Sequence, residues 1–452
     1  MSNSKHIVAI FGGAVSGAEA AYQLTQKGIR VVVFDQNTLP YGKIEDGLPK
    51  WHVKLRDKEE EKINEKLSHP LVTYVPNVRL GEDLEFEDVV NNWGFTAVML
   101  ATGAWKDRPL PIEGIDHYVN KGLYYQNPFI YWYNHKHEPD YNGLQYDIVD
   151  NAIIVGGGLA SLDVAKVFMF ELVEKALKER GHEVNLFQLD RSIAKVLKPL
   201  GLTLDDLGIK GCTIFYRRRV KDMPLTPLET DTPEKLAKAQ RVRTKIFNNY
   251  QRKYLFNIKP CHMPVDKIVE GERLEGLVFQ KTKIEDGRVV PVPGSETEYR
   301  SPVVISSIGS IPEVIDGIPM NGQVYRVNRN QCCRIEGFNH VFALGNAVTG
   351  RGNINESLKH GRNVSQSLVE KYLSVEKVYA DGYQMARDKI VDKIANISDG
   401  FSGLAMPSSA TCEAIEQRIA ALHAKVGYDG NYQQWVARHL PVRLEDMIGE
   451  VH

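Results

Sequence analysis

The stretch HIVAIFGGAVSGAEAAYQLTQKGIRVVVFD, residues 6–35, decides the fold of the amino-terminal part of this chain. In it an apolar run, a glycine-rich turn, an alanine-rich helix and a second apolar run follow one another. This order predicts a βαβ unit, in which backbone N–H groups at the start of the helix bind the pyrophosphate of a dinucleotide. Asp35 follows the second strand, 23 residues after Gly12, where a carboxylate can accept hydrogen bonds from a ribose.

The glycine turn keeps the first and last glycines of the pattern GxGxxG but has Ala14 in the middle. The first glycine allows the tight turn, the last lets helix and strand pack closely, and the middle one normally gives the pyrophosphate room. Because strand, helix and acid are in register, we predict that Gly12, Ala14, Gly17 and Asp35 bind a nucleotide. The alternative is a plain glycine-rich turn with an exposed Asp35.

A second unit of the same kind occupies residues 151–177, NAIIVGGGLASLDVAKVFMFELVEKAL. Its turn has Gly156 and Gly158 at the first two glycine positions and Ser161, a residue small enough for close packing, at the last. These three residues are predicted to bind a second nucleotide. Two dinucleotides in one chain indicate that a hydride passes from one to the other.

Two segments compete for the strand whose end contacts the adenosine ribose of the second nucleotide. One is EVNLFQLD, which ends at Asp190 and would favour NAD, because a carboxylate accepts from a free ribose hydroxyl. The other is CTIFYRRR, whose Arg217, Arg218 and Arg219 would bind a 2′-phosphate and favour NADP. The spacing favours the first segment, and a solvated basic loop is a further reading of the arginines.

The composition is that of a globular protein, because 43% of the 452 residues are hydrophobic and 25% are charged. A formal net charge of −1 gives no overall attraction to nucleic acid or to anionic membranes. The five cysteines are odd in number and form no CxxC pair, so we expect no disulfide framework, iron–sulfur cluster or metal site. No run of 18 apolar residues occurs and the polar start leads straight into a strand, so we expect no membrane span and a cytoplasmic location.

Several separated motifs resemble those of a known family, the adrenodoxin-reductase-like ferredoxin–NADP reductases, which share their two-nucleotide fold with the glutamate synthase small subunit. The motifs are similar to PxG…GVAPDH, ATG, FVxWYN and LDVAR of that family. In the GVAPDH part of the first motif, only the first glycine and the final histidine are kept. They lie at Pro40-Tyr41-Gly42-Lys43 with Asp46-Gly47-Leu48-Pro49-Lys50-Trp51-His52, at Ala101-Thr102-Gly103-Ala104, at Phe129 with Trp132-Tyr133-Asn134, and at Leu162-Asp163-Val164-Ala165-Lys166.

The arginine segment resembles the same group of proteins. Tyr216 with the arginines, and the following Met-Pro pair at 223–224, look like the glutamate synthase small subunit, while Thr226 and Glu229 fall where the reductases have a glutamate on the nicotinamide side. This resemblance implies NADP at the second site and makes residues 181–211 an insertion between helix and strand. Asp190 stays the rival for NAD.

The last motifs resemble the flavin side of the family. Gly345-Asn346 stands where many flavoproteins have Gly-Asp against the ribityl chain, and the amide of Asn346 can still bind a ribityl hydroxyl. Residues 350–355 resemble the loop onto the last helix of the FAD domain, which implies a flavin near Gly352, Asn353 and Ile354. Backbone N–H groups at the start of that helix would suit the electron-rich edge of a reduced flavin.

The resemblance implies FAD at the first unit and NADP(H), or else NAD(H), at the second. His52, Asp163 and Glu229 are the candidates for arranging the nicotinamide and flavin edges, with a surface histidine and a plain helical residue as the alternatives for the first two. The implied cofactor residues are Gly12, Ala14, Gly17, Asp35, Gly42, Thr102, Gly103, Gly156, Gly158, Ser161, Arg217, Arg218, Gly345, Asn346, Gly352, Asn353 and Ile354.

The fold class expected is therefore α/β, with two Rossmann-like dinucleotide-binding domains. A FAD domain of residues 1–108 and 335–370 would hold an inserted NAD(P) domain of residues 109–334, and residues 371–452 would form a helical carboxy-terminal extension. The function implied is a FAD-dependent NAD(P)H oxidoreductase that exchanges electrons with a small ferredoxin-type protein. The alternative is an electron-transfer subunit of a larger redox complex that uses NAD(H). A disulfide reductase is disfavoured, because Cys332 and Cys333 are adjacent and would strain the backbone if bridged.

The partner expected is a small acidic electron carrier, a ferredoxin or flavodoxin. Residues 235–259 hold eight basic residues and no acidic one, a charge pattern that attracts an acidic protein. A solvated helix face is the alternative, and we expect no nucleic acid partner. The carboxy-terminal extension would cover the flavin, form a homodimer or attach the chain to a complex.

Overall fold

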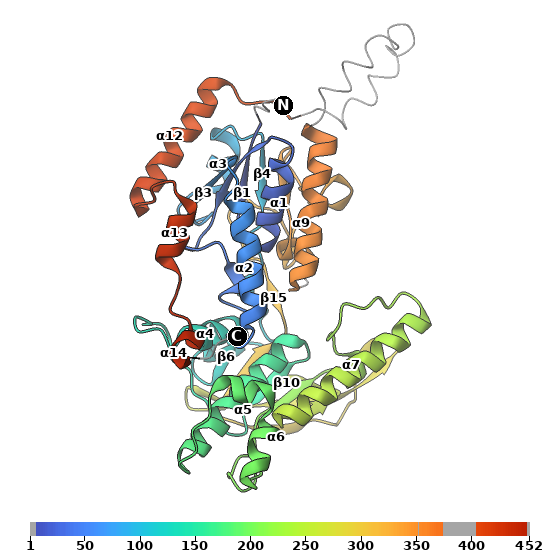
Figure 1. The fold of residues 1–452 in the computed structure, drawn as a ribbon. Helices are drawn as coiled ribbons and strands as arrows, with labels where there is room; N and C mark the ends of the chain where they lie inside the picture. The colour runs from blue at the N-terminus through green and yellow to red at the C-terminus, as the bar shows by residue number, and fades with distance from the viewer. Residues whose placement is uncertain (1–5, 351, 374–403, 450–452) are drawn as a thin grey trace. The chain divides into compact units, whose positions relative to one another are not determined.

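The structure is a computed structural model that describes residues 6–350, 352–373 and 404–449. It divides into two compact units, each made of segments that are separate in the sequence (Figure 1). Unit 1 comprises Met1–Asp46, Lys54–Lys106 and Ser310–Pro441, and unit 2 comprises Gly47–Val53, Asp107–Gly309 and Val442–His452.

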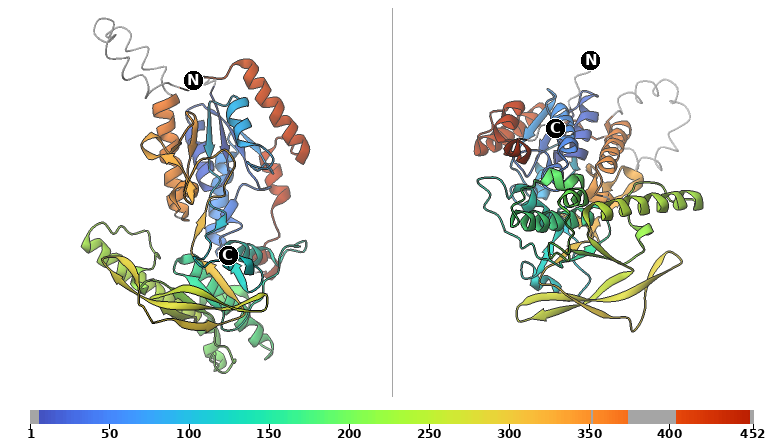
Figure 2. Two further views of the ribbon diagram at one scale, coloured as in Figure 1. Left: turned by 180° about the vertical axis from the view of Figure 1, so that it is seen from behind. Right: turned by 60° about the horizontal axis from the view of Figure 1, so that its bottom comes forward.

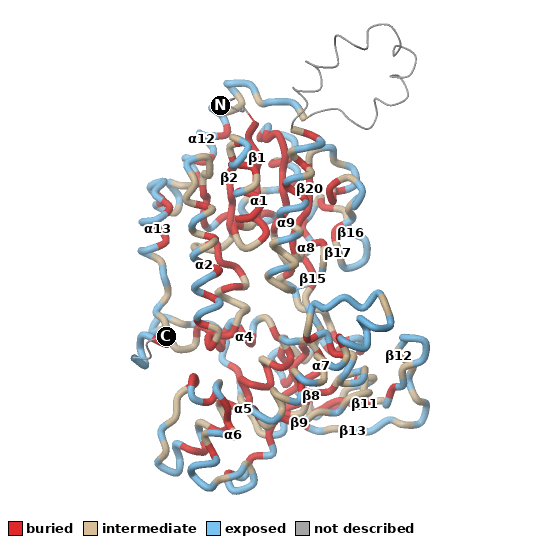
Figure 3. Tube along the Cα trace, turned by 45° about the vertical axis from the view of Figure 1, so that its right-hand side comes forward, coloured by how far each residue is buried: buried red, intermediate tan, exposed pale blue. Residues whose placement is uncertain are grey.

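Unit 1 is built on a seven-stranded sheet in the order β18-β19-β20-β4-β1-β2-β3. The five strands from β20 to β3 are parallel, and β1 lies among them with every residue buried, as strands covered on both faces are. Figure 3 shows these buried strands in the middle of the unit. The strands are β1 (Ile7–Phe11), β2 (Arg30–Phe34), β3 (Val72–Val75), β4 (Ala97–Leu100), β18 (Val327–Asn328), β19 (Arg334–Ile335) and β20 (Val341–Ala343).

Helices α1 (Val15–Thr25) and α9 (Ile354–Leu368) pack closely against each other in unit 1. A Cβ atom added to Gly361 of α9 would lie 2.6 Å from the carbonyl oxygen of Ser16 on α1, so only glycine permits this approach. The remaining helical elements of the unit are η1 (Gly42–Ile44), α2 (Val53–Leu67), which begins at the last residue of a unit 2 segment, α3 (Phe86–Asn92), η4 (Arg329–Gln331), α8 (Asn346–Thr349) and η5 (Val369–Leu373).

The carboxy-terminal helices α12 (Ser409–Val426) and α13 (Tyr432–His439) lie on the β3 side of the unit 1 sheet (Figure 1). Ile415, Ile419 and Leu422 of α12 join the core that surrounds this sheet. The extension predicted to be helical over 371–452 is thus helical in α12 and α13, whereas its residues 374–403 lie outside the described residues. The short helix α14 (Leu444–Ile448) belongs to unit 2.

Unit 2 contains a five-stranded parallel sheet in the order β6-β14-β7-β8-β9. Its strands are β6 (Leu123–Tyr125), β7 (Ile153–Gly156), β8 (Thr213–Tyr216), β9 (Asn257–Pro260) and β14 (Val304–Ser307). Its helices are η2 (Ile115–Tyr118), α4 (Gln126–His135), α5 (Leu159–Lys178), α6 (Leu186–Leu200), η3 (Val220–Asp222) and α7 (Pro233–Tyr254).

A second, antiparallel sheet packs on the same unit and is drawn as a long twisted ribbon in Figure 2. Leu274, Leu277 and Phe279 of its longest strand are buried against Phe215 of β8. The strands are β10 (His262–Glu270), β11 (Arg273–Glu285), β12 (Arg288–Pro291) and β13 (Thr297–Arg300). The short strands outside these three sheets are β5 (Lys106–Asp107), β15 (Ser310–Ile311), β16 (Met320–Asn321) and β17 (Val324–Tyr325).

The segment EVNLFQLD forms the start of helix α6 and not a strand, so that prediction was wrong. A capping box begins the helix: the Asn185 side chain accepts from the Gln188 N–H at 3.0 Å, and the Gln188 side chain accepts from the Asn185 N–H at 2.9 Å. Leu186 and Leu189 are then buried on one face of the first helical turns. CTIFYR instead supplies β8, next to β7, and residues 181–211 lie between helix α5 and strand β8.

The predicted domain boundaries are not those of the two compact units. Residues 310–334, expected in the NAD(P) domain, lie in unit 1, and Gly47–Val53, expected in the FAD domain, lies in unit 2. The assignment of one cofactor to each domain stays a prediction. No helix within residues 6–350, 352–373 and 404–449 is both long and apolar enough to cross a membrane, and the cytoplasmic location stays a prediction.

Candidate functional site

The first glycine turn joins β1 to α1 in unit 1, and two of its glycines are required by close backbone contacts. Gly12 has a φ of +103°, and a Cβ there would lie 2.4 Å from the carbonyl oxygen of Ala101. A Cβ on Gly17 would lie 1.8 Å from the carbonyl oxygen of Gly12. The turn therefore has the backbone geometry that the sequence predicts for a pyrophosphate-binding loop.

Asp35 closes this turn from the end of β2. Its Oδ2 accepts from the Gly13 N–H at 2.7 Å, and its Oδ1 accepts from the Asn37 N–H at 2.9 Å. The side chain is buried, and desolvation raises the pKa of the carboxyl to about 6, against the lowering effect of the two backbone hydrogen bonds. A carboxylate has further lone pairs that can accept from a ribose hydroxyl. The alternative prediction, an exposed Asp35, is wrong, because the side chain is buried.

Ala14, the residue in the middle position of the turn, lies next to Gly42. Gly42 has a φ of +50°, and a Cβ added to it would be 3.1 Å from the methyl group of Ala14. The absence of a side chain at Gly42 therefore makes room for the methyl group that replaces the usual glycine. The sequence placed both residues in the site but did not reveal that they are neighbours.

Thr102-Gly103 follows β4 and Gly345-Asn346 follows β20, so both pairs lie at the carboxyl edge of the parallel strands, where nucleotides bind in such sheets. Asn346 is partly buried, and its Oδ1 has no hydrogen-bond partner in the part of the chain that the structure describes. A buried amide oxygen without a donor fits a bound hydroxyl group, as the ribityl chain of FAD would supply.

His360 belongs to this edge although no motif in the sequence identified it. Its Nδ1 accepts from the Gly345 N–H at 3.0 Å, and its Nε2 lies 3.6 Å from the Cys333 sulfur. Burial lowers the pKa of the imidazole, which favours the neutral form that accepts this hydrogen bond. Nothing in the spacing of the sequence signals this role, because Gly345 and His360 are 15 residues apart and belong to different elements.

Asn353 caps helix α9 with its own side chain. Its Oδ1 accepts from the N–H groups of Asn355 at 2.9 Å and Glu356 at 3.4 Å. Two of the backbone N–H groups at the start of this helix are thus already paired with Asn353. The N–H group of Ile354 is not paired with that side chain. Gly352 lies beside Asn346, because a Cβ on it would be 3.7 Å from the Asn346 Nδ2.

The second glycine turn joins β7 to α5 in unit 2. A Cβ on Gly156 would lie 2.3 Å from the carbonyl oxygen of Ser307, and one on Gly157 would lie 2.1 Å from the ring of Tyr216. At Gly158 a Cβ would meet nothing within 4 Å. The open side of Gly158 is the space that a pyrophosphate needs in front of the helix start, and Ser161, buried behind it, donates to the Gly158 carbonyl at 2.7 Å.

Two serine hydroxyls that sequence reasoning missed lie beside this turn. Ser306 and Ser307 end strand β14, which pairs with β7, and both are buried. Neither Oγ has a hydrogen-bond partner among the described residues. Unpaired hydroxyls at the carboxyl edge of a parallel sheet fit a polar ligand, and their only sequence signal was the SSIG run after an apolar strand.

The three arginines after β8 differ in what they bind. The Arg218 guanidinium donates to the Gly287 carbonyl, and Arg219 forms an ion pair with Asp222 at 2.7 Å. Arg217 is exposed, and its guanidinium has no hydrogen bond or ion pair within the described parts of the chain. Because β8 is the strand next to β7, Arg217 lies at the strand end where dinucleotide-binding folds commonly place a residue that contacts the adenosine ribose.

His52 and Asp163 are brought together in unit 2. The His52 Nε2 lies 3.9 Å from the Asp163 Oδ1, and the two side chains are 32% and 17% exposed. Asp163 is on α5, two residues after Ser161, so the same helix fixes it and the glycine turn. Glu229 is not part of this pair: it is exposed in the loop before α7 and binds Lys235 at 2.7 Å.

Asp190, the rival for NAD, lies in helix α6 and forms an ion pair with a buried lysine. The Lys166 Nζ lies 2.5 Å from the Asp190 Oδ1 and has only 2% of its side chain exposed. The rings of Trp51 and Tyr254 surround it, with centroids 4.1 and 4.7 Å from the Nζ. Burial lowers the pKa of Lys166, and the nearby Asp190 charge opposes this effect. The ion pair gives Asp190 a partner within this chain.

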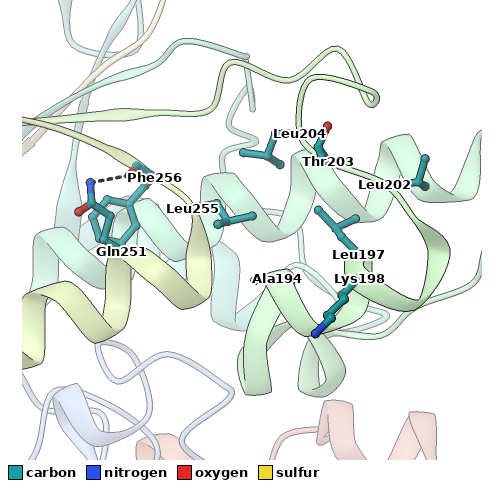
Figure 4. A pocket seen from close by; sticks show the side chains of 9 residues that line it. All are labelled: Ala194, Leu197, Lys198, Leu202, Thr203, Leu204, Gln251, Leu255 and Phe256. Atoms are coloured by element: carbon teal, nitrogen blue, oxygen red, sulfur yellow. Dashed lines mark hydrogen bonds between the residues drawn. The ribbon is translucent and has the colours of Figure 1, made fainter.

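A pocket of about 550 Å³ lies between α6 and α7 (Figure 4). Most of its surface is apolar, and none of the predicted cofactor or catalytic residues lines it, so it is separate from the second glycine turn. Its lining residues are Ala194, Leu197, Lys198, Leu202, Thr203, Leu204, Gln251, Leu255 and Phe256.

Residues 6–200 match the family model described as pyridine nucleotide-disulphide oxidoreductase. The chain is 25% identical over 354 residues to the mitochondrial NADPH:adrenodoxin oxidoreductase of Arabidopsis thaliana, a match that covers 70% of this chain and 69% of that protein. It is 26% identical over 378 residues to the glutamate synthase (NADPH) small chain of Bacillus subtilis, covering 81% of this chain and 67% of that one. The solved structure of Mycobacterium tuberculosis FprA in complex with NADPH shares the fold, with a TM-score of 0.67, 19% identity and coverage of 93% of this chain and 91% of FprA.

The fold and its two glycine turns define a two-dinucleotide-binding flavoprotein oxidoreductase, for which FAD and a pyridine nucleotide are the cofactors. The predicted fold class is confirmed. The chain is a homologue of the adrenodoxin-reductase-like ferredoxin–NADP reductases and of the glutamate synthase small chain, so the resemblance found in the sequence is confirmed as well. The unpaired Asn346 amide and the open side of Gly158 show that the residues present fit these two cofactors.

Proposed function

We propose that this protein is a FAD-dependent NADP(H) oxidoreductase that exchanges electrons with a small iron–sulfur protein of the ferredoxin type. The single observation that carries the proposal is the pair of glycine turns, one in each unit, each with close contacts that only glycine permits; the second is also open in front of Gly158. The homology to NADPH:adrenodoxin oxidoreductase supports the choice of nucleotide and of electron carrier.

FAD would be held in unit 1, with its pyrophosphate at the turn from Gly12 to Gly17 and its adenosine ribose at Asp35. Asn346 would bind the ribityl chain. The remaining unit 1 contacts proposed are Ala14, Gly42, Thr102, Gly103, Gly345, Gly352, Asn353 and Ile354.

NADP(H) would be held in unit 2, with its pyrophosphate in front of Gly158 and its 2′-phosphate at Arg217. The side chain of Arg217 supports this choice, because it is exposed at the end of β8 and holds no other group in the described chain. Gly156, Ser161 and Arg218 complete the proposed set.

When bound, FAD and NADP(H) supply the exchange of a hydride between nicotinamide and flavin, and the protein aligns the rings and manages charge. The Asp163 carboxylate lies 3.9 Å from the His52 Nε2, so the two side chains form a polar pair. We propose that His52 and Asp163 balance charge beside the reacting rings. Glu229 stays a candidate for the nicotinamide side, and its present contact is with Lys235.

The electron carrier proposed is small and acidic, and its docking surface is a basic stripe on α7 formed by Lys238, Arg241, Lys245 and Arg252. These residues are exposed, and spacings of three, four and seven place them on one face of the helix. None of them forms an ion pair with another described residue, so their charge is available to attract an acidic protein. Arg243, which lies on another face and has a buried Nε, is outside the stripe.

The second candidate is an electron-transfer subunit of a larger redox complex that uses NAD(H). The homology to the glutamate synthase small chain, which covers 81% of this chain, supports it. A protein that accepts electrons from a nucleotide but passes none to a free ferredoxin would favour this candidate.

The first experiment adds NADPH or NADH, without oxygen, to the FAD-loaded protein and follows the yellow absorption band of the flavin. Rapid bleaching by NADPH, with slower bleaching by NADH, is the result expected. No bleaching with either nucleotide would overturn the proposed function.

The second experiment measures electron transfer to an acidic ferredoxin in the double variant Arg241→Glu/Lys245→Glu. Its rate should fall and lose most of its salt dependence, whereas ferricyanide reduction, which needs no docking, should stay unchanged. The control is Lys195→Glu, which reverses an exposed charge on α6. Equal rates in the double variant and the unmodified protein would exclude the α7 stripe as the docking surface.

A further inference from the structure

Helix α13 contacts the segment of unit 1 that follows strand β2, residues 36–41. The Trp435 Nε1–H donates to the carbonyl of Thr38 at 2.8 Å. The Tyr432 hydroxyl donates to the Asn64 Oδ1 at 2.7 Å, and the Asn64 Nδ2 donates to the Tyr41 hydroxyl at 2.9 Å. Two hydrogen bonds from α13 therefore reach the middle of this segment and, through Asn64, its end.

An aromatic cluster supports these contacts. Tyr74 of β3 is buried, with the rings of Tyr432 and Tyr428 at centroid distances of 5.3 and 6.2 Å. Its hydroxyl lies 3.3 Å from the Thr38 carbonyl, to which it donates. Burial and the nearby Asp35 charge hold the pKa of Tyr74 far above its usual value, so this donor keeps its proton.

The segment that α13 contacts belongs to the proposed adenosine end of the FAD site. It begins directly after Asp35, whose Oδ1 accepts from the Asn37 N–H at 2.9 Å. It ends against the glycine turn, because a Cβ on Gly13 would lie 2.7 Å from the Cβ of Pro40. The position of residues 36–41 thus fixes both the carboxylate that would bind the ribose and one wall of the pyrophosphate turn.

We infer that helix α13 is part of the cofactor-binding machinery: it holds residues 36–41 in the conformation that binds the adenosine half of FAD, and so sets how tightly FAD is retained. Tyr432 and Trp435 are positioning residues, since Trp435 binds the segment directly and Tyr432 binds it through Asn64. The inference rests on the proposed function in one respect, that unit 1 binds FAD. The sequence alone left the role of the carboxy-terminal extension open, and this inference assigns α13 a role.

The test is the double variant Tyr432→Phe/Trp435→Phe, which removes both hydrogen-bond donors, keeps the ring of residue 432 and replaces the Trp435 indole with a smaller aromatic ring. FAD is added to the apoprotein, and its dissociation constant is measured from the change in flavin fluorescence. Two neutral hydrogen bonds predict a rise in the dissociation constant of roughly 10- to 30-fold, with a faster release of FAD. If the double variant does not fold, Trp435→Phe alone should raise the constant several-fold.

The matched control is Glu416→Gln on the same carboxy-terminal segment. Glu416 binds Arg30 at 2.6 Å at the amino end of β2, whereas α13 acts beyond its carboxyl end. The control should bind FAD within twofold of the unmodified protein. An unchanged dissociation constant in the folded double variant, or an equal loss in Glu416→Gln, would overturn the inference. An unmodified protein that binds no FAD would instead overturn the proposed function.

Discussion

Arg217 is the residue on which the proposed preference for NADPH depends most directly. Strand β8 ends just before it, next to β7, and its exposed guanidinium holds no other described group. Arg218 would first have to release the Gly287 carbonyl, and Arg219 would have to release Asp222. The three neighbours therefore differ in what it costs them to bind a 2′-phosphate.

Replacing Arg217 with alanine removes the charge-assisted hydrogen bonds to that phosphate. Such bonds contribute about 1.5–3 kcal/mol, and about 2 kcal/mol suits an exposed side chain that water also solvates. The value of kcat/KM for NADPH should then fall about 30-fold, while that for NADH, which has no 2′-phosphate, should stay unchanged. Arg219→Ala should change both by less than about threefold, because Arg219 already binds Asp222.

The assay is ferricyanide reduction by the FAD-loaded protein, with kcat/KM determined for both nucleotides in the unmodified protein, Arg217→Ala and Arg219→Ala. The ratio of the NADPH value to the NADH value is the quantity compared, because it cancels any general loss of activity. A ratio within twofold of the unmodified protein in Arg217→Ala would refute the assignment. So would a larger effect in Arg219→Ala.

Three further predictions concern stability and the second turn. Gly157→Ala should lower the melting temperature, because the new Cβ would meet the Tyr216 ring at 2.1 Å, whereas Gly158→Ala should leave it unchanged and weaken NADPH binding. Lys166→Met removes the ion pair with Asp190, whose carboxylate is 30% exposed and can be solvated, and should cost about 1 kcal/mol in urea unfolding. The Asp35 carboxyl has a pKa of about 6 in the folded protein and an ordinary value of 3.8, so the folded state binds more protons than the unfolded state between these pH values. The free energy of unfolding of the apoprotein should therefore fall by up to roughly 3 kcal/mol as the pH rises from about 4 to about 6. Asp35→Asn should remove this pH dependence.

The sequence predicts the parts of the fold that short-range patterns determine. The β1–α1–β2 unit, Asp35 at its end and the second unit at residues 151–177 follow from apolar runs, glycine spacing and a helical pattern, and all are present. The segment EVNLFQLD was misassigned because its apolar residues suit either a strand or a helix, and the capping box at Asn185 decides for the helix.

The parts that the sequence did not predict depend on contacts between distant residues. Gly42 lies next to Ala14 and His360 accepts from Gly345 only because the fold brings separate segments together. Glu229 was placed with His52 by resemblance alone, and its contact with Lys235 could not be read from spacing.

The seven residues Gly47–Val53 have a consequence for how this protein can be taken apart. They belong to unit 2, although the rest of that unit begins at Asp107, and Trp51 supplies a ring of the cage around Lys166. Residues 107–309 are therefore not portable as one continuous piece: grafted alone into another protein, they would keep the Tyr254 ring beside Lys166 but lose the ring of Trp51. Chimaeras made within this group of homologues should exchange both segments together.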